Sequence, residues 1–232
     1  MIVVECDIAD FPGAQHTLRN TLVFTLHDSA PLPSWVTPDP LTAPELARLT
    51  RTTHPKAREQ FRRGRAVLRS ALGLWLGMPP QSVPLVTTTD GKPVLDGIDG
   101  HHFNVSHTDG VAVFAIGDVP VGVDVERHSA TRDLAGLVKR YFTPEEVEQF
   151  HGLPEEVKSA AFLRGWTCKE AILKGIGCGV RELANCAVEL DPTRPARAVR
   201  TPVGHGVWEL TTWEVADGLV AAAAVASVCG EK

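Results

Sequence analysis

Phe162-Leu163-Arg164-Gly165 repeats, with one substitution, the stretch Phe61-Arg62-Arg63-Gly64, and the same offset pairs Leu173 with Leu72. On its own, a match of four residues is as consistent with chance as with duplication. Each stretch, however, lies on a long predicted helix that precedes a sheet-like region, and this order favours two similar α+β units. We therefore predict an α+β fold in which two similar subdomains form a pseudo-two-fold arrangement, with the active site in the cleft between them.

The predicted halves are residues 1–118 and 119–232. In the first, a helix begins at Thr42 or Ala43, Pro55 interrupts it before a second helix, and Met78-Pro79-Pro80 ends that second helix. In the second, Thr143-Pro144-Glu145-Glu146 is typical of a helix start with a capping box, and a longer helix spans about Glu155 to Lys174. Asp90-Gly91 is a hairpin signal. Strands are predicted over residues 1–11, 83–87, 93–95, 111–116, 119–126, 186–190, 207–215 and 219–228.

Composition limits the class of protein. With 44% hydrophobic and 22% charged residues among 232, the chain resembles a water-soluble globular protein. The chain has five cysteines, an odd number, and they form no C-x-x-C pair. This pattern favours a reducing cytoplasm over a disulfide framework or a zinc knuckle. The start, residues 1–11, lacks the basic region of a signal peptide, and no apolar run reaches the ~20 residues of a membrane span. We therefore expect no membrane association.

Charge argues against a general nucleic-acid partner, because the formal net charge is −5 and such binding needs a concentrated basic surface. One local basic cluster is present on the second predicted helix. It is either a solvated helix face or a contact for phosphate or for an acidic partner. Its members are Lys56, Arg58, Arg62, Arg63, Arg65 and Arg69.

Two carboxylates alternate with valines in Val121-Gly122-Val123-Asp124-Val125-Glu126. If the valines face the core, Asp124 and Glu126 leave it together on one strand face, where they repel each other unless a cation lies between them. Mg²⁺ suits such hard oxygen ligands. A solvated strand face is the commoner explanation of a bare D-x-E pattern.

The stretch Trp166 to Lys174 places Trp166, Glu170 and Lys174 on one helix face. Glu170 and Lys174 could form a surface ion pair only. The glycine-dense continuation, residues 175–179, predicts instead that the backbone closely approaches another group.

Ser106 and His107 close the segment Phe103-Asn104-Val105-Ser106-His107. No G-x-S-x-G elbow surrounds the serine, which argues against a nucleophilic role. His101, His102 and His107 lack the spacing or the cysteine partner of a transition-metal site, so a structural role for them is favoured.

Together these stretches resemble Sfp-type 4′-phosphopantetheinyl transferases. The motifs lie in the family's order over about residues 41–179, and Trp166 with Lys169-Glu170-Ala171 resembles the branch that often serves polyketide and fatty-acyl carriers. The motifs are Gly91-Lys92-Pro93, Phe103 to His107, Gly122 to Glu126, Phe142 to Glu146 and Trp166 to Lys174 with its glycine tail.

The resemblance implies two α+β halves with coenzyme A between them. It also implies Mg²⁺ on Asp124, Glu126 and Glu170, shared with the coenzyme A diphosphate. The cofactor-binding set that it implies is Arg58, Gly91, Lys92, Pro93, Ser106, His107, Asp124, Glu170 and Lys174. In this set Arg58 is the candidate for the 3′-phosphate, with Lys56 and Arg62 as rivals.

By the same resemblance, Glu170 is the catalytic base and Lys174 the residue that assists the leaving phosphate. The reaction would convert an apo acyl or peptidyl carrier protein to its holo form and release 3′,5′-ADP. Two alternatives stay open: a Mg²⁺-dependent hydrolase of coenzyme A or a nucleotide, and a non-enzymatic coenzyme A or carrier-binding scaffold. The internal duplication favours a monomer.

Overall fold

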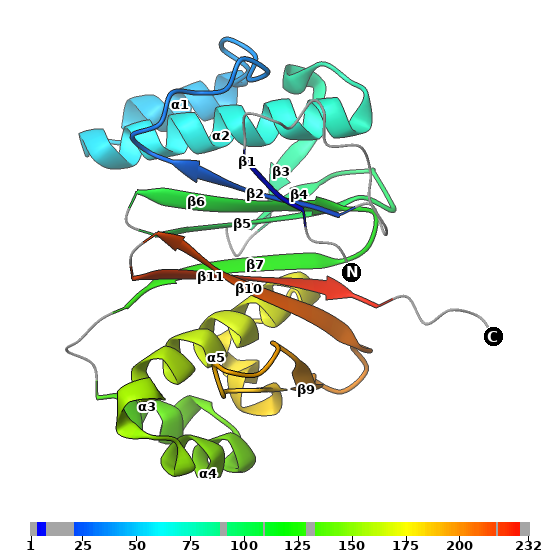
Figure 1. The fold of residues 1–232 in the computed structure, drawn as a ribbon. Helices are drawn as coiled ribbons and strands as arrows, with labels where there is room; N and C mark the ends of the chain where they lie inside the picture. The colour runs from blue at the N-terminus through cyan, green and yellow to red at the C-terminus, as the bar shows by residue number, and fades with distance from the viewer. Residues whose placement is uncertain are drawn as a thin grey trace.

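The chain forms four layers. The computed structural model describes residues 4–7, 21–88, 92–108, 110–128, 133–216 and 218–227. Figure 1 shows α1 and α2 on the outside, then two β-sheets face to face, then a second group of helices. The helices are α1 Ala43–Arg51, α2 Pro55–Leu76, α3 Leu134–Tyr141, α4 Pro144–Gly152 and α5 Glu155–Ile176, with 3₁₀ turns η2 Pro80–Ser82 and η3 Val180–Asn185. The strands are β1 Val4–Asp7, β2 Thr21–His27, β3 Leu85–Thr87, β4 Pro93–Leu95, β5 His102–Thr108, β6 Val111–Gly117, β7 Val121–Arg127, β8 Ala187–Val188, β9 Ala198–Arg200, β10 Trp208–Ala216 and β11 Leu219–Ala226.

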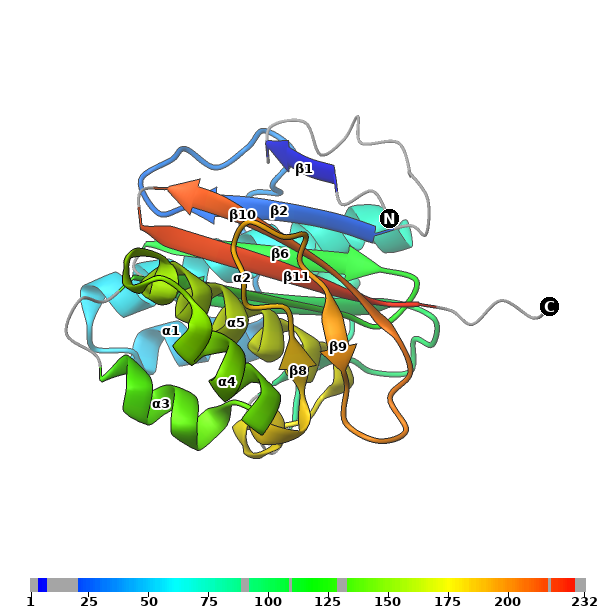
Figure 2. The same ribbon diagram turned by 60° about the horizontal axis from the view of Figure 1, so that its bottom comes forward.

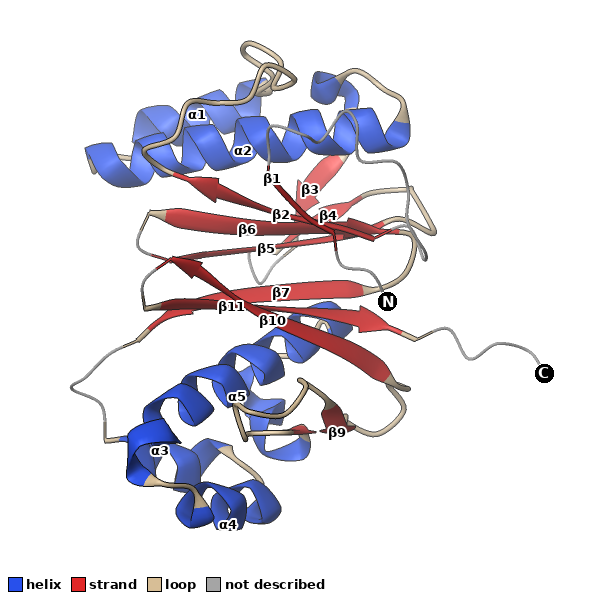
Figure 3. Cartoon of the chain, in the orientation of Figure 1, coloured by secondary structure: helices blue, strands red, loops and turns tan. Residues whose placement is uncertain are grey.

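Two main sheets form the middle of the molecule, as the strand colouring of Figure 3 makes clear. One has the order β1-β2-β6-β5 and the other β10-β11-β7; β3-β4 and β8-β9 are separate two-stranded pairs. All pairs within the two main sheets are antiparallel except β1 with β2. Long helices cover the outer face of each sheet, so the predicted α+β class with two similar halves is confirmed.

Alternation of valine with other residues decides how the sheets meet. Val121, Val123 and Val125 of β7 are fully buried in a cluster with Val113 of β6 and Ala221 of β11. Because successive strand residues point to opposite faces, the even-numbered residues of β7 point away from this inter-sheet core. They face α5 instead.

Helix α5 approaches β7 unusually closely at two glycines. A Cβ atom on Gly122 would lie 1.9 Å from the Ala171 carbonyl oxygen, and one on Gly175 would lie 2.5 Å from the Trp208 ring. The predicted close approach of the glycine tail is therefore real at Gly175, but its partner is the protein's own β7 and β10. Gly177 has a different task, because it ends α5 in the left-handed conformation at φ 88°.

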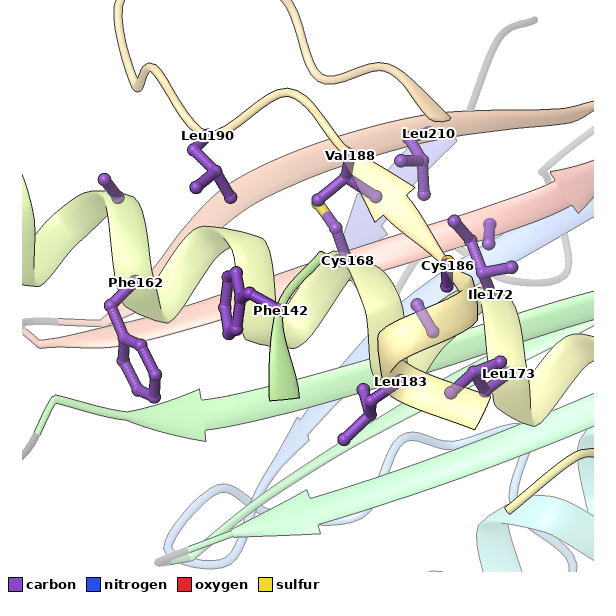
Figure 4. Packing of buried hydrophobic residues seen from close by; sticks show 14 of the residues in the cluster. Phe142, Phe162, Cys168, Ile172, Leu173, Leu183, Cys186, Val188, Leu190 and Leu210 are labelled. Carbon is purple, nitrogen blue, oxygen red and sulfur yellow. The ribbon is translucent and has the colours of Figure 1, made fainter. Parts of the chain in front are cut away.

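The second half has its own core beneath α5. Figure 4 shows Cys168, Ile172 and Leu173 of this helix directed toward residues that follow it in the chain, among them Leu183 and Val188. Figure 2 shows β8 and β9 beside α5, where they close this core. The equivalent core of the first half lies between α2 and the sheet that contains β2 and β6.

The repeated arginine does the same work in both halves. Arg63 of α2 donates to the carbonyl oxygens of His27 and Ala30, and Arg164 of α5 donates to those of Asp191 and Arg194. Each guanidinium thus holds a loop against its long helix. The repeated glycine does not have the same role in the two halves. Other atoms fill the space that a Cβ atom on Gly165 would need, whereas the corresponding space at Gly64 is open.

Several sequence predictions for single elements hold. Thr42 and Thr143 are the N-caps of α1 and α4, and both helices have the expected capping box. Pro55 is the first residue of α2, and α5 begins at Glu155 and continues to Ile176. Among the described strands and α-helices, β2, β5, α3 and β9 were not predicted, and neither were the 3₁₀ turns η2 and η3. No helix among the described ranges is long and apolar enough to cross a membrane.

Candidate functional site

Asp124 lies in the middle of β7 on the face opposite the valines. The alternative of a solvated strand face is wrong for this residue, because Asp124 is only 2% exposed. Glu126, two residues later on the same face, is half-buried. The sequence pattern therefore places a buried carboxylate at the seam between β7 and α5.

Polar side chains from two other elements bind the carboxylate of Asp124. Its Oδ1 accepts hydrogen bonds from Ser106 Oγ of β5 at 2.9 Å and from Lys174 Nζ of α5 at 2.5 Å. Lys174 Nζ also donates to Ser106 Oγ at 3.0 Å. Asn104 supports this arrangement, because its Oδ1 accepts the backbone N–H of Val123 at 3.1 Å and so joins β5 to β7. The two halves thus meet in one polar cluster: Ser106, Asp124 and Lys174.

The second oxygen of Asp124 is a candidate ligand atom. Asp124 Oδ2 is buried and has no hydrogen-bond partner among the described residues. An unpaired buried acceptor is costly, and the cost is higher for a charged group. This oxygen therefore favours a cation or a donor from outside the chain.

Glu170 adds a second negative group on the same side of α5. Burial raises the pKa of the Glu170 carboxyl, and the carboxylates of Asp124 and Glu126 raise it further, while the Lys174 ammonium opposes the shift. Like charges act on one another in this way only when they are close. The three predicted metal ligands are therefore electrostatic neighbours.

The donor set fits a hard divalent cation in chemistry, although it is not yet a closed cage. In the described part of the chain, no three His, Cys, Asp or Glu side chains are gathered closely enough to hold a metal as they stand. Oxygen ligands supplied partly by the protein and partly by phosphate and water are nevertheless what Mg²⁺ prefers. Asp124, Glu126 and Glu170 are the residues that could hold it.

Lys92 brings a further positive charge to the site. Its Nζ donates to the backbone carbonyl of Lys174 at 2.8 Å, which places it at the C-terminal end of α5, and burial lowers the pKa of its ammonium group. Pro93 follows it as the first residue of β4. Gly91, the third member of this predicted motif, and the Asp90-Gly91 hairpin signal lie outside the described residues.

His107 and Ser106 do not act as a pair. Ser106 is buried and His107 is exposed, because neighbouring strand residues point to opposite sides. His101 is not part of a metal cluster either, since its Nδ1 lies 3.1 Å from Asp118 Oδ1 and 3.2 Å from Trp75 Nε1.

Most of the basic cluster on α2 has protein partners. Arg62 pairs with Glu59, Arg65 and Arg69 with Glu45, and Arg63 with the loop carbonyls. Only the side chains of Lys56 and Arg58 in this cluster have no hydrogen bond or ion pair to another described residue. Lys56 and Arg58 are therefore the members of the cluster best able to bind an anion.

Sequence reasoning missed the role of Lys169. Its ammonium is completely buried and lies 2.6 Å from Glu146 Oε2, so it points away from the site into the second core. The signal was available, because Lys169 falls among the apolar residues Phe162, Ile172 and Leu173 on the inner side of α5. A lysine in such a position needs a buried acidic partner.

The chain is similar to proteins of known family. The family model of the 4′-phosphopantetheinyl transferase superfamily matches residues 120–227. The 4′-phosphopantetheinyl transferase HetI of Nostoc sp. PCC 7120 is 40% identical over 190 residues, covering 80% of this chain and 78% of that protein. The 4′-phosphopantetheinyl transferase psf-1 of Bacillus pumilus is 33% identical over 117 residues, covering 50% and 49%, respectively. The 4′-phosphopantetheinyl transferase Sfp of Bacillus subtilis is 24% identical over 193 residues, covering 77% and 84%.

Proposed function

This chain belongs to the 4′-phosphopantetheinyl transferase superfamily, and we propose that it transfers the phosphopantetheine arm of coenzyme A to a carrier-protein serine at the seam where Ser106, Asp124 and Lys174 meet. The observation that carries the proposal is this polar cluster, in which β5 of one half and α5 of the other both bind the same buried carboxylate. A diphosphate between the halves would find cations and ligand oxygens from both sides.

Mg²⁺ would be held by Asp124, Glu126 and Glu170 together with the diphosphate of coenzyme A. The orphaned Asp124 Oδ2 supports this assignment, as does the effect of the Asp124 and Glu126 carboxylates on the pKa of Glu170. When bound, the ion supplies neutralisation of the diphosphate charge.

Protein side chains would position and stabilise the reacting groups, which is the main demand of phosphoryl transfer. Glu170, directly or through one water, takes the proton of the carrier serine, and the serine oxygen forms a bond to the phosphorus that bears pantetheine. The bond from that phosphorus to the 3′,5′-ADP phosphate oxygen breaks. Lys174 stabilises or protonates this leaving phosphate. The raised pKa of Glu170 suits a general base, because a carboxylate with a higher pKa binds a proton more strongly.

Nucleotide phosphates would be bound by Lys92, Ser106 and His107, and Gly91 and Pro93 of the same motif belong to the proposed coenzyme A-binding set. Arg58 is the proposed contact for the 3′-phosphate, and its lack of a protein partner in the described chain agrees with that role. The rival Arg62 is already paired with Glu59. Lys56 stays as the second candidate.

Mass spectrometry tests the reaction. A panel of apo acyl and peptidyl carrier proteins is incubated with the protein, coenzyme A and Mg²⁺, and the products are analysed as intact proteins and small molecules. We expect one phosphopantetheine added to a carrier and an equal amount of 3′,5′-ADP. Release of free phosphopantetheine with no modified carrier would support the hydrolase alternative and contradict the proposal. Binding of coenzyme A with no product at all would support the scaffold.

The carrier partner is proposed to be acidic, to dock near α2, and to be modified by a monomeric enzyme in the cytoplasm. Among the described residues, the basic cluster has only the Lys56 and Arg58 side chains without a hydrogen bond or ion pair, so the electrostatic contribution should be modest. Raising the salt concentration should raise KM for the carrier more than KM for coenzyme A. An equal response of both constants would contradict docking at this surface.

A further inference from the structure

Lys174 is the closest partner of the carboxylate that is proposed to hold the metal. Its Nζ lies 2.5 Å from Asp124 Oδ1 and 3.0 Å from Ser106 Oγ, which itself donates to the same carboxylate oxygen. About a third of the Lys174 side chain is exposed. The ammonium therefore neutralises Asp124 from within the site while it stays accessible to a ligand.

A divalent cation and this ammonium compete for one carboxylate. If the cation binds Oδ1, it displaces Lys174. If it binds the unpaired Oδ2, it lies beside a positive charge in a buried setting, where repulsion is strong. Either way, Lys174 opposes binding of the metal alone. A diphosphate reverses the effect, because it gives the ammonium a second anionic partner.

Lys92 further disfavours a metal ion bound without an anion, although it does not contact the Asp124 carboxylate. It donates to the backbone carbonyl of Lys174, so it holds a second positive charge near the last turn of α5. That turn carries the negative end of the helix dipole, which favours ammonium groups over it. The charges around Asp124 therefore favour binding of an anion first and of a metal ion only together with that anion.

We propose that Lys174 is a resident counter-ion that makes a divalent cation and coenzyme A bind as a pair. The proposal rests on the proposed function and adds a coupling to it. By linkage, the factor by which coenzyme A raises metal affinity equals the factor by which the metal raises coenzyme A affinity. Removing the ammonium should shrink this factor, because the metal-alone state is relieved and the diphosphate loses a partner.

The test measures binding of Mn²⁺ alone and of Mn²⁺ in the presence of coenzyme A. Free Mn²⁺ is followed by electron paramagnetic resonance, and coenzyme A binding by isothermal titration calorimetry, for the wild type and Lys174→Met. We expect Lys174→Met to bind Mn²⁺ alone about tenfold more tightly, or about 1.4 kcal/mol, and coenzyme A more weakly. The coupling factor should fall at least about tenfold.

Lys92→Met is the matched control, because it also removes one positive charge near the site but leaves Asp124 untouched. We expect less than about a threefold gain in affinity for Mn²⁺ alone. Lys174→Gln serves as a second neutral variant, and circular dichroism checks the fold of each protein. An unchanged or weaker affinity of the folded position-174 variants for Mn²⁺ alone would overturn the proposal, as would an equal gain in Lys92→Met.

Failure of the coupling is distinguishable from failure of the proposed function. A wild-type protein that modifies a carrier and binds coenzyme A, but whose Lys174→Met variant shows unchanged metal binding, would overturn the counter-ion role alone. A wild-type protein that neither modifies any carrier nor binds coenzyme A would overturn both.

Discussion

Replacing Lys169 by methionine should destabilise the protein strongly, although this residue lies next to the proposed catalytic base. The ammonium is completely buried, donates to Glu146 Oε2 at 2.6 Å and to the Tyr141 carbonyl oxygen at 3.1 Å, and lies over the Phe142 ring. Glu146 is only 2% exposed. The substitution therefore leaves a buried carboxylate without its cation.

The size of the expected loss in unfolding free energy depends on the hydrogen bonds that Glu146 retains. Removing one partner of a buried ion pair typically costs about 3–5 kcal/mol. Glu146 still accepts the backbone N–H groups of Thr143 and Val188, each at 2.8 Å, and these hydrogen bonds stabilise its charge. We therefore expect a loss near the lower end, about 3 kcal/mol of unfolding free energy. For a chain of this length that corresponds to a fall in Tm of about 6–12 °C.

Urea unfolding and calorimetry of Lys169→Met measure the loss, with Lys158→Met as the control. Lys158 lies on the same helix and pairs with Glu155, but that pair is at the surface and should contribute less than about 1 kcal/mol. A double-mutant cycle with Glu146→Gln isolates the pair. A loss for Lys169→Met no larger than that for Lys158→Met would refute the assignment of a buried ion pair.

Three further outcomes are expected. Glu170→Gln should abolish carrier modification in the mass-spectrometric assay. It should also raise the unfolding free energy by up to about 1 kcal/mol, because a buried charge beside like charges is removed. Full activity or a lower stability would contradict this expectation. Gly122→Ala should cost about 3 kcal/mol in urea unfolding, since its Cβ would lie 1.9 Å from a backbone oxygen of α5. Gly64→Ala, which meets no atom within 4 Å, should not destabilise. Burial raises the pKa of Glu45, but the pairing with Arg69, the backbone N–H of Thr42 and the charge of Arg65 together lower it overall. Its stabilising effect is therefore complete above pH 4.5 and disappears as the pH falls through the lower folded-state pKa, so Glu45→Gln should flatten the acid side of the stability curve.

Much of the fold could be predicted from local patterns in the sequence. Proline and threonine positions located the starts of α1, α2 and α4, because capping depends on neighbouring residues only. The valine alternation of β7 correctly separated the core face from the face of Asp124. The repeated Phe-x-Arg-Gly stretch indicated two similar halves, and its arginine has the same loop-holding role in each.

Long-range packing was harder to predict. That Asp124 is buried depends on the closeness of α5, which rests on Gly122 and Gly175 facing each other across two elements. The buried role of Lys169 depends on Glu146, an element away in sequence. The bond between Lys174 and Asp124 likewise joins residues that no local pattern connects. Strand β5 does alternate Phe103 and Val105 with the polar residues Asn104 and Ser106, but these polar residues are buried against β7 and do not face water, and their long-range partners could not be read from the local pattern.

The central claim is that Asp124, Glu126 and Glu170 together hold one divalent ion against the diphosphate of coenzyme A. A crystal structure of the protein with coenzyme A and Mn²⁺, with data collected at the manganese absorption edge, tests it directly. We predict one anomalous peak at about 2 Å from carboxylate oxygens of these residues and from the diphosphate. A peak elsewhere, or a diphosphate bound away from Asp124 and Lys174, would contradict the account.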